Sequence, residues 1–147
     1  FRPASEGPKA TSTTIGIDAE SYPITMSGTG LFPYEVAPAW LDFGAVAVGA
    51  SHELPVVITN LSAVEQSPAF AGGAPFDHEN FGGWQNCAGV TLPPDGSCLF
   101  TYVFHPVAIG GPIESYTGIW LDGRNFRIDF VGYGVSDRIF ADGFQSP

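Results

Sequence analysis

The sequence predicts an all-β fold in which short strands pack as a sandwich, and three observations lead to this prediction. The 147 residues include 19 glycines and 13 prolines, too many for long helices. Runs of β-branched and aromatic residues recur every 10 to 15 residues with glycine or proline between them, which is typical of a sandwich. The hydrophobic content of 44% excludes an intrinsically disordered chain, because such a chain lacks the apolar residues of a core.

Two central strands are predicted from their local patterns. Residues 53–60 are rich in β-branched side chains and have a turn-forming residue at each end. Residues 98–105 alternate in character, so every second side chain is expected on one buried face. The members of that face are Cys98, Phe100, Tyr102 and Phe104.

A hairpin is predicted toward the end of the chain. Its first strand covers residues 113–121, and its turn covers residues 122–125, which begin with Asp-Gly. Asp-Gly between two strand patterns indicates a hairpin, because glycine accepts a positive φ without steric cost. In the second strand Phe126, Ile128 and Phe130 alternate with polar residues, as in a half-buried antiparallel strand.

The start of the chain repeats this closing hairpin. Residues 13–30 align without gaps on residues 117–134, at an offset of 104. Any two sandwich hairpins share some features, but matched turn acids and paired glycines favour a true repeat. We therefore predict a partial repeat at 1–30, a complete sandwich at 31–136 and a C-terminal tail at 137–147. The matched positions include Ile15 with Ile119, Ile17 with Leu121, Tyr22 with Phe126, Ile24 with Ile128, and Met26 with Phe130.

Charge and composition exclude several kinds of partner. The chain has 15 acidic and 5 basic residues, a net charge of −10, so it repels nucleic-acid phosphates and anionic lipid heads. No window approaches 18 apolar residues, so no membrane span is expected. The low lysine content with abundant glycine, serine and threonine is typical of a secreted or cell-surface protein. A signal peptide is not expected in residues 1–7.

The two cysteines, Cys87 and Cys98, are separated by residues that turn the chain back on itself, including two prolines and two glycines. In an oxidising compartment we expect a disulfide between them, which would contribute about 3 kcal/mol in the chain-entropy description. The alternative is a pair of buried thiols. No histidine lies at ligand spacing from them, so a zinc site is not expected.

Five motifs in order resemble the ASH (Hydin-type) family, and secreted bacterial members known as choice-of-anchor proteins are the nearest likeness. They lie at residues 41–49, 56–61, 92–98, 104–106 and 130–134. The resemblance implies an immunoglobulin-like β-sandwich of the PapD and major-sperm-protein type, and it implies no catalytic residues.

Candidate chemistry in the sequence is sparse. Asn60 begins a formal glycosylation sequon, but the resemblance assigns it a structural role, which we favour. Residues 77–80 could ligate a metal weakly, although an acidic solvated loop is the simpler interpretation. Trp84 and Trp120 could form a sugar platform, but an aromatic residue in a sandwich strand is more often part of the core. We expect no enzyme, no cofactor and no metal site.

The functional hypothesis rests on the apolar face predicted for residues 1–30, which consists of Ile15, Ile17, Tyr22, Ile24 and Met26. Either other copies of the protein or adjacent repeats of a longer chain must cover this face. The leading hypothesis is therefore a non-catalytic structural subunit of an extracellular bacterial fibre or surface assembly, joined by strands from residues 1–30. The main alternative is a secreted tandem module that binds glycan or peptide through loops in residues 72–97, with Trp84 as its contact. Other members of the family suggest a third hypothesis, a cytosolic ciliary or centrosomal targeting domain.

Overall fold

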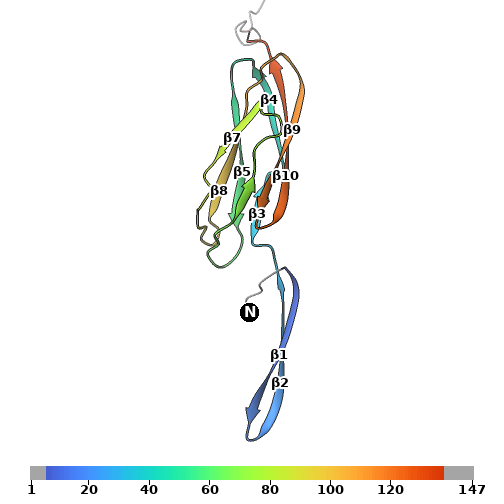
Figure 1. The fold of residues 1–147 in the computed structure, drawn as a ribbon, viewed down its shortest axis with the longest axis vertical. Coiled ribbons are helices and arrows are strands. Elements are labelled where there is room, and N and C mark those ends of the chain that lie inside the picture. Colours follow the sequence, from blue (N-terminus) through green and yellow to red (C-terminus); the bar gives the residue numbers. More distant parts are fainter. Residues whose placement is uncertain (1–5, 138–147) are drawn as a thin grey trace, which may run out of the picture. The chain divides into compact units, whose positions relative to one another are not determined.

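A computed structural model describes residues 6–137 of the chain (Figure 1). These residues form ten β-strands and no helix. The chain divides between Pro33 and Tyr34 into two compact units, each with its own sheets. The strands are β1 (Gly7–Ile17), β2 (Glu20–Gly30), β3 (Tyr34–Ala37), β4 (Trp40–Ala47), β5 (His52–Asn60), β6 (Phe70–Gly72), β7 (Phe81–Gln85), β8 (Ser97–Phe104), β9 (Gly110–Leu121) and β10 (Arg124–Val135).

The first unit is a hairpin of two long antiparallel strands. β1 and β2 pair along their whole length, from Ile17 opposite Glu20 to Gly7 opposite Gly30. Asp18 and Ala19 connect them with φ values of 49° and 71°, the two positive values of a type I′ turn. This turn twists in the same sense as the strands, so the pairing continues to its tip.

The second unit is a sandwich of two four-stranded sheets. One sheet has the order β4-β10-β9-β6 and the other has the order β3-β5-β8-β7. All pairs are antiparallel except that of β4 with β10, which is parallel. The predicted all-β sandwich is confirmed, and the predicted strand at 53–60 corresponds to β5.

The predicted closing hairpin consists of β9 and β10. Asp122 and Gly123 form its turn with φ values of 48° and 81°. Leu121 pairs directly with Arg124, so the turn has two central residues and is shorter than the predicted 122–125. A strand pair that was expected from local sequence is thus present with the expected chain reversal.

The core of the sandwich is rich in aromatic rings contributed by both sheets. Phe43 and Phe130 come from one sheet, while Phe81, Tyr102 and Phe104 come from the other. The ring centroids of Phe81 and Phe104 are 4.9 Å apart, and those of Tyr102 and Phe130 are 4.7 Å apart. Each of the five side chains is at most 2% exposed, so they contribute much of the hydrophobic stabilisation of this unit. The predicted inward face of residues 98–105 is confirmed, with Cys98, Phe100, Tyr102 and Phe104 all buried.

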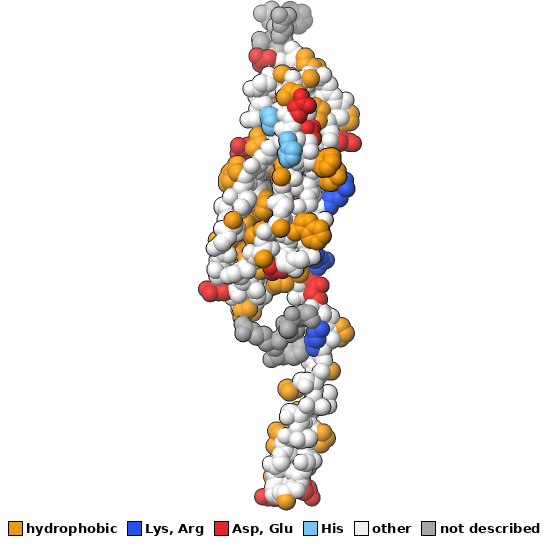
Figure 2. All heavy atoms as spheres, in the orientation of Figure 1, with side chains coloured by type: hydrophobic (Ala, Val, Ile, Leu, Met, Phe, Trp, Pro, Cys, Tyr) orange, Lys and Arg blue, Asp and Glu red, His pale blue; other side chains and the backbone are white. Residues whose placement is uncertain are grey.

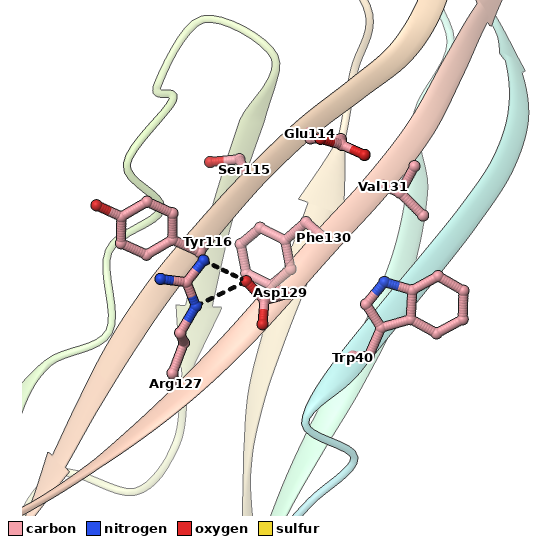
Figure 3. A pocket seen from close by; sticks show the side chains of 8 residues that line it. All are labelled: Trp40, Glu114, Ser115, Tyr116, Arg127, Asp129, Phe130 and Val131. Carbon is pink, nitrogen blue, oxygen red and sulfur yellow. Dashed lines mark hydrogen bonds and ion pairs between the residues drawn. The ribbon is translucent and has the colours of Figure 1, made fainter.

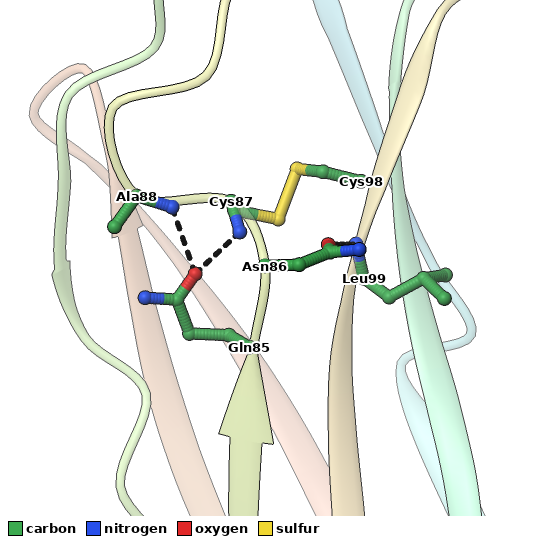
Figure 4. Close-up of a disulfide and its surroundings, with 6 residues drawn as sticks. All are labelled: Gln85, Asn86, Cys87, Ala88, Cys98 and Leu99. Atoms are coloured by element: carbon green, nitrogen blue, oxygen red, sulfur yellow. Dashed lines mark hydrogen bonds between the residues drawn. A yellow bond between two sulfur atoms is a disulfide. The ribbon is translucent and has the colours of Figure 1, made fainter.

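A disulfide joins Cys87 to Cys98, as predicted, so the alternative of two thiols is wrong (Figure 4). It ties the segment after β7 to the start of β8, and both cysteines are buried. The neighbouring amides support the bridge, because Gln85 Oε1 accepts bonds from the Cys87 and Ala88 N–H groups. The closed loop is short, with a sequence separation of 11, for which the chain-entropy description gives a stabilisation of about 3 kcal/mol.

Asn60 has a structural role at the end of β5. Its side chain is fully buried, and its amide nitrogen donates to the carbonyl oxygens of Val64, Leu92 and Pro93. Its Oδ1 accepts bonds from the N–H and hydroxyl of Ser62. Because the amide is buried and fully engaged in hydrogen bonds, the cap interpretation holds and the sequon is not accessible in the folded unit.

Candidate functional site

The most distinctive feature of the hairpin β1–β2 is that its two faces differ. Register places Ile15 opposite Tyr22, and neighbouring pairs put Ile17, Ile24 and Met26 on the same face. We call these five side chains the apolar face. Each of them is between 39% and 58% exposed, and Figure 2 shows hydrophobic side chains at the surface of this hairpin. The five residues predicted from the sequence therefore share one face and are left open to solvent.

The other face of the hairpin carries small side chains. The large hydrophobic residues of the hairpin all belong to the apolar face, so the opposite face offers little surface for packing. An alternation of this kind predicts one buried and one solvated face. Its members are Pro8, Ala10, Ser12, Thr14, Gly16, Ser21, Pro23, Thr25, Ser27 and Thr29.

The counterpart of the apolar face in the sandwich is core. Phe126 is opposite Ile119 in the hairpin β9–β10, as Tyr22 is opposite Ile15 in β1–β2. Ile119, Leu121, Ile128 and Phe130, which align with Ile15, Ile17, Ile24 and Met26, are at most 1% exposed. The same register therefore presents the same kind of face in both hairpins, and the other sheet covers it in one of them.

The strand edges of the first hairpin also lack partners within the described part of the chain. In residues 6–33, β1 pairs with β2 and with no other strand. The corresponding strands β9 and β10 have further neighbours, β6 and β4 respectively. Near the turn, the hydroxyl of Tyr22 donates to Glu20 Oε2 at 2.7 Å, and this bond raises the pKa of Tyr22. The apolar face thus has a polar boundary at its tip and open hydrogen-bonding edges.

The two tryptophans considered for a sugar platform are exposed. Trp84 on β7 is 53% exposed and Trp120 on β9 is 47% exposed, so the expectation that such residues belong to the core is wrong for both. Strand alternation is the reason at Trp120, because Ile119 and Leu121 on either side of it are buried. The two tryptophans lie in different sheets and do not form one platform.

The loop at 77–80 is occupied by internal hydrogen bonds. Asp77 Oδ1 accepts from the backbone N–H groups of Glu79 and Asn80, and Oδ2 accepts from the side chain of Asn80. Burial raises the pKa of Asp77, but these hydrogen bonds outweigh burial, so the pKa is lowered overall. Across residues 6–137, no group of three potential metal ligands is found.

Sequence reasoning missed a groove on the outer face of the β4-β10-β9-β6 sheet. It has a volume of about 480 Å³ and is shown in Figure 3. Trp40 stands on one side, Tyr116 on the other, and Arg127 and Asp129 lie between them. Tyr116, Arg127 and Asp129 belong to one hairpin, but Trp40 joins them only through the pairing of β4 with β10, which are distant in sequence, so no local motif marked the groove. One sequence signal could have indicated the groove: Trp40 precedes the buried Leu41 in an alternating strand, which places the tryptophan on the outer face of the sheet.

No helix in residues 6–137 is long and apolar enough to cross a membrane. Comparison with protein-family models finds no match, and comparison with curated proteins finds none either.

Comparison with solved structures identifies the fold. The ASH/PapD-like domain 7 of human CEP192 superposes with a TM-score of 0.51 and 12% identity, over 71% of this chain and 86% of that domain. A protein of unknown function from Porphyromonas gingivalis gives 0.50 and 14% identity, over 90% of this chain and 68% of that one. At these identities the likeness concerns architecture, and the narrower choice-of-anchor resemblance stays a prediction. The chain has the immunoglobulin-like β-sandwich fold of ASH and PapD-like domains.

Proposed function

We propose that the protein is a non-catalytic structural subunit of an extracellular bacterial fibre or surface assembly, in which the hairpin β1–β2 joins neighbouring sandwiches. The observation that carries the proposal is the apolar face: four of its five counterparts in β9–β10 are core residues, and the fifth, Phe126, is half-buried. Because β1–β2 has the register and apolar face of a closing hairpin, we expect it to complete a sandwich.

Hydrophobic burial supplies the driving force for this joining. Burying a large apolar side chain fully contributes about 1.5–3 kcal/mol, and the five side chains of the apolar face are about half exposed. Covering them would therefore contribute roughly 4–8 kcal/mol before the entropy of ordering is subtracted. Backbone hydrogen bonds along the open edges of β1 and β2 would add orientation and specificity.

The pairing of β9–β10 indicates what the neighbour must offer. It needs a parallel strand beside β2, as β4 lies beside β10, and an antiparallel strand beside β1, as β6 lies beside β9. It also needs an apolar inner face equivalent to that of β5 and β8. The partner that meets these needs is another sandwich of this type, either in another copy or in an adjacent repeat of a longer chain.

A folded copy already fills the hairpin position of its own sandwich with β9–β10. A second copy therefore accepts β1–β2 either at a sheet edge or by displacement of its own closing hairpin, β9–β10. In a longer chain, β1–β2 would itself be the closing hairpin of an adjacent repeat, and that repeat would accept β1–β2 without displacing another hairpin. Assembly between copies is thus expected to be slow where β9–β10 must be displaced, whereas pairing with an adjacent repeat needs no displacement. The rate of assembly therefore distinguishes a second copy from an adjacent repeat as the partner.

The compartment and the charge are consistent with this role. A disulfide forms and persists in oxidising environments, which include the cell surface and the extracellular space. The net charge of −10 opposes non-specific lateral association between subunits. The absence of catalytic activity belongs to the same proposal.

A second candidate function is supported by the exposed Trp84 on β7. A ring that is 53% exposed beside the loops of residues 72–97 suits a contact with glycan or peptide. Loss of ligand binding in Trp84→Ala would support this module, and unchanged binding would contradict it.

The assembly proposal is tested by sedimentation velocity of the full chain over a wide range of concentration. We expect oligomers that grow with concentration, and we expect the variant Ile15→Thr/Ile24→Thr to remain monomeric. The matched control is Thr14→Ser/Thr25→Ser, which changes the opposite face of the same strands and should assemble like the wild type. A wild-type chain that stays monomeric at every concentration contradicts assembly between copies.

A further inference from the structure

The outer face of the β4-β10-β9-β6 sheet carries a row of side chains that crosses several strands. Trp40 of β4 pairs with Asp129 of β10, and Asp129 pairs with Tyr116 of β9. Neighbouring strands lie about 4.8 Å apart, so the backbones at Trp40 and Tyr116 are about 10 Å apart with Asp129 between them. These residues line the groove, and Arg127 and Asp129 lie between its two aromatic sides.

One wall of the groove is the ring of Tyr116, which contacts two neighbouring side chains. The ring of Tyr116 is held between two groups, with the Arg127 guanidinium 4.1 Å from its centroid and the Phe76 ring stacked at 5.2 Å. The backbone N–H of Phe76 also donates to the Tyr116 carbonyl oxygen at 2.9 Å. These contacts restrict the orientation of the Tyr116 ring, so part of the ordering cost is met before a ligand binds.

The floor of the groove is a solvent-exposed ion pair between Arg127 and Asp129. Arg127 Nε and Nη2 both reach Asp129 Oδ1, at 2.8 Å and 2.7 Å, as Figure 3 shows. Both contacts end on the same oxygen, so the carboxylate keeps Oδ2 as an acceptor, and the guanidinium keeps further N–H donors. The floor therefore offers donors and acceptors side by side.

The opposite wall is an open aromatic ring. Trp40 is 56% exposed, whereas Leu41 and Phe43, which lie on the opposite face of the same strand, are core. An exposed indole face binds the apolar face of a ligand and excludes water from the neighbouring polar contacts. Its position at the start of β4 fixes it beside the ion pair.

We propose that this groove binds a neutral hexopyranose glycan, with Trp40 stacked on the sugar ring and the Arg127–Asp129 pair bonded to adjacent hydroxyls. A hydroxyl both donates and accepts, so two neighbouring hydroxyls satisfy the carboxylate and the guanidinium together. The C–H face of the same ring provides the apolar surface that the indole requires. The inference is independent of the hairpin β1–β2, because every residue it uses lies in the second unit.

Other ligand classes fit this groove less well. A proline-rich peptide also stacks on aromatic rings, but it presents carbonyl acceptors and leaves Asp129 without a donor. An acidic glycan meets Asp129, Glu114 at the rim of the groove, and a net charge of −10. The donor and acceptor pattern therefore selects a neutral polyhydroxyl ligand.

The test titrates the full chain, labelled with ¹⁵N, with oligosaccharides of glucose, mannose, galactose and N-acetylglucosamine. Decaproline and polygalacturonate serve as the peptide and acidic-glycan probes. The indole N–H signals of the three tryptophans report the site. We expect at least one neutral oligosaccharide to shift the Trp40 signal and to leave the Trp84 signal unchanged.

Variants then assign the roles. Trp40→Ala and Asp129→Asn should each weaken binding about tenfold or more, equivalent to about 1.4 kcal/mol or more. Trp40→Phe should retain part of the affinity, and Trp84→Ala, on the other sheet, should bind like the wild type. Thermal unfolding of each variant shows whether it is folded.

Two results would overturn the proposal. One is the absence of a Trp40 shift with all four neutral oligosaccharides. The other is binding of decaproline or polygalacturonate at Trp40 in place of the neutral sugars, which would assign the groove to peptide or acidic glycan. If the first result comes with a shift at Trp84, it favours the loop module.

Discussion

The hairpins β1–β2 and β9–β10 share their type of turn and the alignment of their apolar residues, and they differ in what surrounds them. Both have a two-residue turn with positive φ at each position, and both align their large apolar residues on one face. That face is half exposed in the first hairpin and almost completely buried in the second. Strand pairing is thus set by local sequence, whereas burial depends on a second sheet, which β1–β2 lacks among the described residues.

The largest expected difference comes from truncating matched core positions. Ile128→Ala should lower the free energy of unfolding of the sandwich by about 2–5 kcal/mol, because the side chain is 1% exposed. Ile24→Ala, at the equivalent position of β2, should change it by less than about 1 kcal/mol in the dilute chain. Guanidinium denaturation followed by tryptophan fluorescence measures both. Equal losses would mean that the two faces are equally buried.

Removal of the disulfide should act on the sandwich alone. The variant Cys87→Ala/Cys98→Ala loses a cross-link within the second unit, and its free energy of unfolding should fall by about 3 kcal/mol. The assembly behaviour of β1–β2 should be unchanged under conditions in which the sandwich stays folded. Denaturation and sedimentation measure the two effects, and a loss of assembly in a folded variant would contradict the separation of the two units.

High pH should destabilise the sandwich through its buried tyrosines. Burial raises the pKa of Tyr34 and of Tyr102 to about 12, against an ordinary value of 10.0. Below pH 10 both rings are neutral in the folded and unfolded states, so this contribution to stability is fully present. Between pH 10 and 12 the unfolded chain ionises first, so stability falls with rising pH. Denaturation midpoints across this range check the effect, and Tyr102→Phe should flatten the decline.

The smallest effect concerns the turns. Ala19 adopts a φ of 71° where the matching residue of the other turn is Gly123. A left-handed conformation costs an alanine about 1 kcal/mol, so Ala19→Gly should stabilise β1–β2 and Gly123→Ala should weaken β9–β10 by similar amounts. Amide exchange near each turn measures the change. A loss of protection in Ala19→Gly, or a gain in Gly123→Ala, would show that the two turns are not equivalent.

Much of this comparison is predictable from the sequence, because it rests on short-range patterns. The alternation of Phe126, Ile128 and Phe130, the Asp-Gly turn and the matching of residues 13–30 all lie within single hairpins. The disulfide is also predictable from the sequence, because its two cysteines flank one chain reversal. Local periodicity determines which face of a strand is apolar.

The groove at Trp40 was not predictable in this way. Its row depends on the parallel pairing of β4 with β10, between residues that are distant in the sequence. The exposure of Trp84 and Trp120 does not follow from residue type; at Trp120 it follows from the burial of the adjacent Ile119 and Leu121. Contacts that cross strands require the order of the sheet, which no single strand encodes.

Hydrogen exchange followed by mass spectrometry tests the central claim most directly, with β9–β10 as the internal reference. In dilute full chain we expect β1–β2 to exchange rapidly while β9–β10 stays protected, and we expect β1–β2 to gain protection in step with assembly. Strong protection of β1–β2 in the dilute monomer, or its rapid exchange in the assembled state, would contradict the account.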